Sequence, residues 1–247
     1  CKKGELLRLL RVDLLLKVVD TISMDIEQEA GRVLEKNLKL KIGDGGEGAD
    51  EEDSIYLWEQ MRDGEQLLAF RRATLDKGTF TDDGVFSPAK GNLNITKGAK
   101  ITTMHHTGKY LLVVTQGGID LENFFMFRCV FNKKDKKFEC EEGPQFSGAN
   151  TNSVLKFFKQ STAMPTITSH LILSMSKTSV GVLDVSVENL LVSAWVTIDI
   201  TKAGLESVSE IQRFGKYVYL VGQKTVGDVL KIAVVKIYPE NNFYSMN

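Results

Sequence analysis

The sequence predicts an all-β repeat protein, and two observations support that prediction. The run Gly108–Gln116 (GKYLLVVTQ) returns further along the chain as Gly215–Gln223 (GKYVYLVGQ). Self-similarity of this kind indicates stacked copies of one supersecondary unit. The second half of the chain is also rich in Val, Ile and Thr, with Gly and Asn at the breaks between apolar runs. That composition is typical of strands separated by turns.

Four copies of the unit can be aligned, roughly 50 residues apart. Their apolar strands begin, in order, near Ile55, Tyr110, His170 and Tyr217. Each copy has an apolar strand, a polar turn, a second apolar or alternating strand and a charged loop. In the first of the four, the turn is expected at Met61–Glu65 and the second strand at Leu67–Phe70. The four prolines fall between candidate strands, where a missing N–H breaks no ladder. They are Pro88, Pro144, Pro165 and Pro239.

A fifth copy is expected at the N-terminal side. Its strands are predicted at Leu14–Val19, Ile22–Ile26 and Leu38–Ile42, with a turn at Glu29–Gly31. The run Leu6–Val19 is also compatible with an amphipathic helix, because its apolar residues match both periods. The strand interpretation is preferred, since it extends the pattern of the other copies.

Repeats of about 40 to 50 residues with about four strands each are typical of a β-propeller. The run GKYLLVV resembles the turn and second strand of propeller blades, so the chain resembles the β-propeller superfamily in architecture, over roughly residues 54–247. The resemblance implies an all-β propeller or propeller fragment with about four to five blade-like repeats. Residues 1–53 would form an incomplete first blade plus an acidic loop, and residues 54–247 one continuous repeat domain of propeller blades.

Two propeller subclasses are not supported by the residues. The chain has no Trp-Asp dipeptide and no Gly-His signature, which argues against a standard WD-repeat protein. The double glycine of kelch repeats occurs in one copy only, at Gly117-Gly118.

Composition sets bounds on the partners. The 247 residues include 31 basic and 32 acidic side chains, so no overall field attracts nucleic acid or anionic membrane. No nucleic-acid partner is therefore expected. The longest apolar runs are broken by charges, so no transmembrane segment is expected. The chain begins at Cys1, which is compatible with a processed product, a lipid-modified bacterial lipoprotein or a piece of a longer protein.

Residues 43–53 offer two candidate ligand sites. Gly43–Gly48 matches G-x-G-x-x-G, but the acidic run Asp50–Asp53 follows where a dinucleotide motif needs a helix N-terminus. The same carboxylates, with Asp44 and Glu47, could hold Ca²⁺, although their spacing matches no EF-hand. A solvated acidic loop, or a docking site for a basic partner, is the preferred interpretation.

The chain has three histidines, His105, His106 and His170. They could bind a metal or act as a base if they faced a central channel. Adjacent strand residues point to opposite faces, so at most one of His105 and His106 could join such a site. Asp184 and Asp199 are isolated in apolar strands and are the most interesting carboxylates for a glycosidase pair. Ordinary structural roles are preferred for all five, and no catalytic, cofactor-binding or metal-binding residue is assigned.

A hairpin is expected between Cys129 and Cys140, with a turn centred on Lys134-Asp135. The two cysteines would then be directly opposite each other, within disulfide range. A two-residue turn would place them in a hydrogen-bonded pair, so two reduced thiols are the preferred interpretation. The basic tip, Lys133–Lys137, is expected to be a solvated turn. One N-glycosylation sequon, Asn94-Ile95-Thr96, is present, and the compartment stays open.

The predicted function is a protein-interaction scaffold, or a structural component of a larger assembly, because blades present broad faces and no chemical constellation is visible. A scaffold should expose an apolar or aromatic patch, with Trp58 and Tyr219 as candidates. The alternatives are a propeller hydrolase of glycosidase or lactonase type, which should show converging Asp, Glu or His, and a lectin-like carbohydrate binder, which should repeat one polar pocket. No cofactor is expected.

Overall fold

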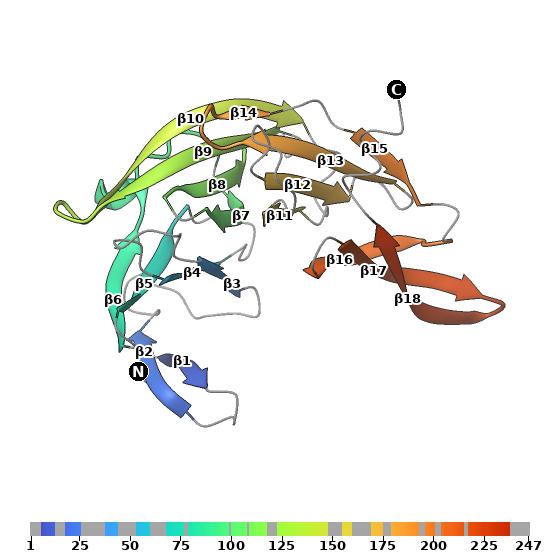
Figure 1. Cartoon of the computed structure of the whole chain (residues 1–247), viewed down its shortest axis with the longest axis horizontal. Helices are drawn as coiled ribbons and strands as arrows, with labels where there is room; N and C mark the ends of the chain where they lie inside the picture. The colour runs from blue at the N-terminus through green and yellow to red at the C-terminus, as the bar shows by residue number, and fades with distance from the viewer. Residues whose placement is uncertain are drawn as a thin grey trace. The chain divides into compact units, whose positions relative to one another are not determined.

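The structure is a computed structural model of the chain, shown in Figure 1. The described residues are 6–12, 18–25, 38–43, 53–59, 68–76, 79–98, 100–107, 109–117, 123–147, 155–159, 169–174, 179–192, 196–200, 204–214 and 217–237. They divide into two compact units. The first contains residues 1–115 and 127–142, and the second contains residues 116–126 and 143–247.

The first two sheets belong to the first unit. Strand β1 (Leu6–Val12) pairs antiparallel with β2 (Val18–Asp25). The next sheet has four antiparallel strands in chain order, which are β3 (Leu38–Gly43), β4 (Asp53–Glu59), β5 (Phe70–Asp76) and β6 (Thr79–Phe86). Because β3 pairs with β4, the residues on both sides of position 53 share one sheet.

The third sheet has four strands. Its strands, in spatial order β10-β9-β8-β7, are β7 (Lys100–His106), β8 (Leu111–Gln116), β9 (Asn123–Asn132) and β10 (Lys137–Ser147). A short 3-10 helix, η1 (Pro88–Lys90), follows β6. The Ser87 side chain caps it by accepting a hydrogen bond from the Lys90 N–H.

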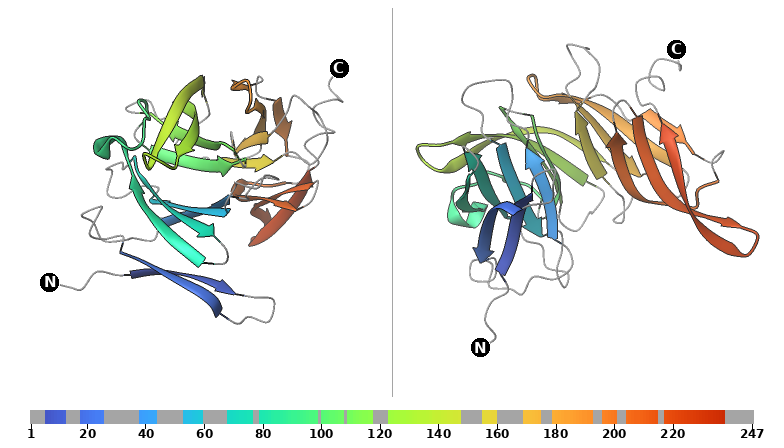
Figure 2. Two further views of the ribbon diagram at one scale, coloured as in Figure 1. Left: turned by 60° about the vertical axis from the view of Figure 1, so that its left-hand side comes forward. Right: turned by 60° about the horizontal axis from the view of Figure 1, so that its bottom comes forward.

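The remaining sheets belong to the second unit. One contains β11 (Leu155–Lys159), β12 (Ser169–Ser174), β13 (Ser179–Ser186), β14 (Leu191–Val192) and β15 (Val196–Asp199), with both β14 and β15 pairing with β13. The other has three strands, β16 (Ser207–Phe214), β17 (Tyr217–Val226) and β18 (Val229–Ile237). Figure 2 shows these three side by side as one sheet.

The predicted fold class is confirmed, since the described chain is all-β and consists of several small antiparallel sheets. The repeat has a definite structural meaning. The four aligned runs fall on β4, β8, β12 and β17, each of which is the second strand of its sheet in chain order. A second strand is flanked on both edges, and in β8 the side chains are also covered on both faces. Continuous apolar runs are typical of such strands.

Several predicted boundaries were wrong. The described parts of the run Leu6–Val19 are strand rather than helix, since Leu6–Val12 forms β1 and Val18 begins β2, which continues to Asp25; residues 13–17 lie outside the described residues. The strand predicted at Leu67–Phe70 instead begins at Phe70, as β5. Pro144 lies inside β10 rather than between strands. It is tolerated there because β10 is at the edge of its sheet. Pro165, Pro239 and the Glu29–Gly31 turn lie outside the described residues.

An aromatic core fills the first unit. Phe86 and Phe138 have ring centroids 5.0 Å apart in an edge-to-face arrangement, and Phe70 and Phe138 pack similarly at 5.3 Å. Such pairs add to the free energy gained by burying their area. Trp58 is part of this buried set and so cannot form a surface patch.

In the described residues, no helix is long and apolar enough to cross a membrane.

The second unit has an aliphatic core around the β16–β18 sheet. Its buried members are Val180, Val182, Ile200, Leu205, Ile211, Val218 and Leu220. Ala233 and Val235 of β18 pack against this cluster and are half-buried. One face of the β16–β18 sheet is therefore covered by β13 and the segments around Ile200 and Leu205.

Candidate functional site

The opposite face of the β16–β18 sheet carries a row of exposed apolar side chains. Side chains alternate along a strand, so Leu230, Ile232 and Val234 point away from the face that holds Ala233 and Val235. The three are 59%, 80% and 61% exposed, and we call them the β18 stripe. Scattered exposed apolar residues are ordinary, but three on one strand face form a contiguous patch of the kind that marks an interaction surface.

The neighbouring strand extends the β18 stripe. Register places Val221 opposite Val234 and Tyr219 opposite Lys236, and Val221 and Tyr219 are half-buried. Tyr219 therefore flanks the patch without being its centre. At one end the Lys236 ammonium lies 3.6 Å from the centre of the Tyr217 ring, a cation–π contact. At the other end, the hairpin residues Val226 and Val229 are 46% and 58% exposed.

The edge of this sheet is also accessible. β18 is the last strand in the order β16-β17-β18, and β17 is its partner among the described strands. An apolar edge strand offers backbone groups to an added strand, and natural proteins cover such edges or place charges on them. Lys231 and Lys236 are exposed on β18. The sheet thus offers an apolar face and an edge with positive charge.

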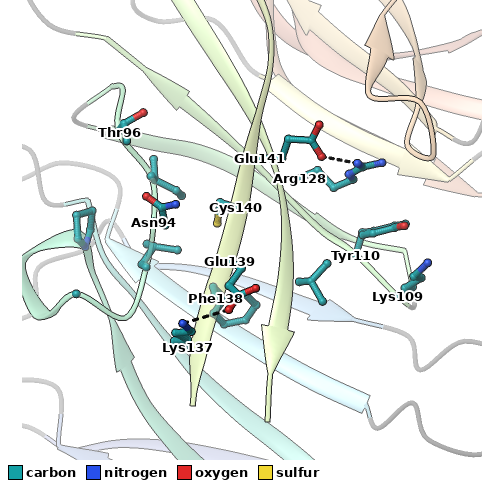
Figure 3. A pocket seen from close by; sticks show the side chains of 15 residues that line it. Asn94, Thr96, Lys109, Tyr110, Arg128, Lys137, Phe138, Glu139, Cys140 and Glu141 are labelled. Carbon is teal, nitrogen blue, oxygen red and sulfur yellow. Dashed lines mark hydrogen bonds and ion pairs between the residues drawn. The ribbon is translucent and has the colours of Figure 1, made fainter. Parts of the chain in front are cut away.

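A second candidate is an open groove of about 1010 Å³ in the first unit, shown in Figure 3. One wall is the segment from η1 to Thr96, which is held to β10 by the Leu93–Phe138 bridge and by a 2.8 Å hydrogen bond from the Phe138 N–H to the Asn92 carbonyl. The other wall consists of the outward residues of β9 and β10. Tyr110 and Lys109 close one end.

The charges of the groove are engaged with one another. Arg128 pairs with Glu141, and the Lys137 ammonium lies 3.1 Å from the Glu139 carboxylate. The Arg128 guanidinium also lies 5.0 Å from the centre of the Tyr110 ring. Both carboxylates are mostly exposed, and each is held by a cation beside it. Each of these carboxylates therefore has a cation partner from its own sheet.

A disulfide joins Cys129 and Cys140 next to this groove, with Cα atoms 4.0 Å apart. The preference for reduced thiols was therefore wrong, and the turn explains why. The turn occupies residues 133–136, because the Asn132 side-chain oxygen accepts hydrogen bonds from the Lys134 and Asp135 N–H groups. A turn two residues longer shifts the alternation of pairs, so the cysteines fall in the closer, non-hydrogen-bonded type.

A buried polar network lies between β4, β5 and β6. Arg72 donates to the Asp83 carboxylate at 2.7 Å and to the Ser54 hydroxyl at 3.1 Å, and its guanidinium lies 4.0 Å from the centre of the Phe131 ring. Thr74 donates to the same carboxylate. Burial raises the pKa of the neighbouring Tyr56 phenol, and the nearby Arg72 charge opposes that rise. Each of these polar side chains has a hydrogen-bond partner within the network, which is typical of a structural role.

The predicted histidine sites are not brought together within either unit. His105 is buried on β7, and His106 is half-buried with its ring centre 6.0 Å from that of Tyr56. His170 belongs to the second unit, where register places it opposite Asp184. Asp199 is exposed on β15 and pairs in register with Ser179. No group of three or more His, Cys, Asp or Glu able to hold a metal occurs in the described residues.

Other predicted features can be placed only in part. Gly43 ends β3 and Asp53 begins β4, but residues 44–52 of the acidic loop lie outside the described residues. The tip residues Lys133, Lys134 and Lys136 are exposed, as expected for a solvated turn. The β18 stripe was missed. A signal was present, because Val229–Ile237 has apolar residues at odd and even positions, which is typical of a strand covered on both faces.

Comparisons with known proteins give a fold likeness only. No protein-family model matches the sequence, and no curated protein matches it significantly. Among solved structures, the chain is similar to an α-L-arabinofuranosidase (CtGH43) from Clostridium thermocellum, with 10% identity and a TM-score of 0.45. That match covers 80% of this chain and 68% of the other. Neither a substrate nor a catalytic residue is carried over from it.

Proposed function

We propose that this chain is a β-propeller, or part of one, that works as a protein-interaction scaffold through the β18 stripe. The observation behind this proposal is the exposure of Leu230, Ile232 and Val234 on one face of a sheet whose other face is already packed. Leaving such a patch in water costs free energy, at roughly 25 cal/mol per Å² of apolar surface. A surface retained at that cost is best explained by a partner that covers it.

The partner that fits is a protein contributing an apolar strand with acidic residues beside it. Strand addition suits an edge strand, since backbone hydrogen bonds give affinity and alternate side chains give specificity. The charges near the stripe favour acidic flanks, because Lys224, Lys231 and Lys236 outnumber Asp228 on the two strands and their turn. Such complementarity speeds association and selects the partner.

Site-specific photo-crosslinking tests this proposal. A photoreactive amino acid is placed at position 232 of the full chain, and at position 189 as a control, because Asn189 is exposed in the same unit but belongs to the β13–β14 turn of another sheet. Proteins crosslinked in the source cells are identified by mass spectrometry. The purified candidate is then titrated against the wild type, Ile232→Lys and Asn189→Lys.

The proposal expects one protein that crosslinks from position 232 and not from position 189. Binding of that protein should weaken at least about tenfold in Ile232→Lys, which corresponds to about 1.4 kcal/mol, and should stay unchanged in Asn189→Lys. The absence of a protein adduct, identical adducts from both positions, or adducts with this chain alone would each overturn the proposal.

A further inference from the structure

We infer that Asn94 is an N-glycosylation site and that the chain folds in the oxidising lumen of a secretory pathway. Two independent observations lead there. The sequence contains one Asn-x-Ser/Thr sequon, at Asn94-Ile95-Thr96, and the structure contains a disulfide between Cys129 and Cys140. Both features depend on the same compartment, because structural disulfides persist where the surroundings are oxidising, and sequons are modified on secreted chains.

The sequon is exposed, as the acceptor of an N-linked glycan must be. Asn94 and Thr96 are exposed, whereas the intervening Ile95 is 4% exposed and anchors the segment. Residues 94–96 have neither helical nor strand structure. Ile95 is buried between them, so the Asn94 amide and the Thr96 hydroxyl are both left on the exposed side of the segment.

The neighbouring Asn92 shows the contrast. Its side chain donates to the Val85 carbonyl and accepts from the Ser87 N–H, both at 2.8 Å, so its amide is committed to holding the turn at η1. The Asn94 side chain makes no such bond to the described residues, and it lines the open groove of Figure 3. The groove leaves space for the first sugar beside the chain.

Glycosylation of Asn94 requires a glycosyl donor of the lipid-pyrophosphate class. The amide nitrogen of Asn94 forms a bond to the anomeric carbon of an N-acetylglucosamine. The bond between that carbon and the pyrophosphate oxygen breaks, the lipid pyrophosphate leaves with the electron pair, and the amide loses one proton. The Thr96 hydroxyl completes the motif that the transferring enzyme reads.

Peptide mapping of the protein purified from its source cells tests the inference. Thiols are blocked before digestion, and peptides are compared with and without peptide-N-glycosidase F. The expected result is a peptide with Asp at position 94 that appears only after the glycosidase, together with linked Cys129 and Cys140 peptides. An unmodified Asn94 peptide as the main species, or blocked free thiols at both cysteines, would overturn it.

Variants expressed through a secretory pathway distinguish the loss of the sequon from general misfolding. Thr96→Ser keeps the hydroxyl and should keep the glycosidase-sensitive mobility shift, whereas Thr96→Ala and Asn94→Gln should lose it. All three should still form the disulfide, because the substitutions leave Cys129 and Cys140 in place. A shift that survives Thr96→Ala, or is absent from both the wild type and Thr96→Ser, contradicts the assignment.

Discussion

Arg72 and Asp83 show how single residues stabilise the first unit. Their side chains are 6% and 17% exposed, so the pair is largely removed from water. Removing one member of a buried pair leaves the other charge uncompensated, which costs about 3 to 5 kcal/mol. Asp83→Asn should therefore lower the free energy of unfolding by an amount in that range, measured by urea denaturation.

The matched control for Asp83→Asn is Glu142→Gln. Glu142 pairs with Lys97 at 2.5 Å, but their side chains are 37% and 51% exposed. Exposed pairs contribute less than about 1 kcal/mol. Equal losses in the two variants would show that burial of the Arg72–Asp83 pair has no energetic consequence.

Tyr56 gives the first unit a stability that falls at alkaline pH. Its pKa in the folded protein is raised above 10.0 by burial. The unfolded chain, with an ordinary phenol, therefore loses its proton first as pH rises. The free energy of unfolding should be unaffected by this group below about pH 9 and should decline from about pH 10 upward.

Tyr56→Phe isolates that effect. The variant loses a buried hydroxyl next to Arg72, which costs on the order of 1 kcal/mol at neutral pH. This deficit relative to the wild type should shrink as pH rises through about 10, because the variant has no phenol to ionise. Denaturation curves of both proteins across that range supply the measurement, and a deficit that stays constant or grows would contradict it.

At the scale of the element, two copies of the repeat differ at one position because of the way β16 pairs with β17. Gly222 of β17 occupies the repeat position of Thr115, whose hydroxyl donates to the Lys97 carbonyl at 2.8 Å. In β16 the register shifts between Val208 and Glu210, which brings the Ser207 carbonyl close to β17. A Cβ on Gly222 would lie 1.9 Å from that oxygen. Only glycine fits at position 222 in this copy of the repeat.

Gly222→Ala should thus separate β16 from β17 locally. We expect a loss of about 1 to 3 kcal/mol or more, as for other overpacked sites, and faster amide hydrogen exchange along β16. Gly227→Ala is the control, because Gly227 lies in the β17–β18 turn at a φ of +63° with no atom within 4 Å of the added Cβ. That variant should be destabilised by backbone strain alone, and amide exchange in β16 should stay unchanged. Similar exchange in both variants would rule out the proposed clash.

Strands were easier to predict from the sequence than the joints between them. The interior strands β4, β8, β12 and β17 each contain a short apolar run, so their residues identify them directly. The β9–β10 turn depends instead on one Asn132 side chain and on Lys136 adopting a φ of +47°, a conformation uncommon for a non-glycine residue. Neither shows in a pattern of apolar residues. The disulfide followed from that turn and was therefore missed.

At the scale of the whole described chain, strands that follow one another within a sheet pair with one another, apart from β15, which pairs with β13 rather than with β14. Pairing between sequence neighbours needs little loop closure. In a meander of this kind, the first and last strands of each sheet are its edges, and the sequence must protect them. Pro144 does so in β10, whereas β18 carries Lys231 and Lys236 among apolar residues.

The β18 stripe yields a prediction for the unbound chain. Ile232 is 80% exposed, so Ile232→Lys should change the free energy of unfolding by no more than about 0.5 kcal/mol. It should also reduce the fluorescence of a bound apolar dye such as anilinonaphthalene sulfonate, because it interrupts the exposed patch. Gln223→Lys is the matched control, since Gln223 is exposed directly opposite Ile232 and gains the same charge without losing apolar surface. If Ile232→Lys instead destabilised the chain like a core substitution, or if both variants bound the dye equally, the stripe would not be an open apolar surface of the free molecule.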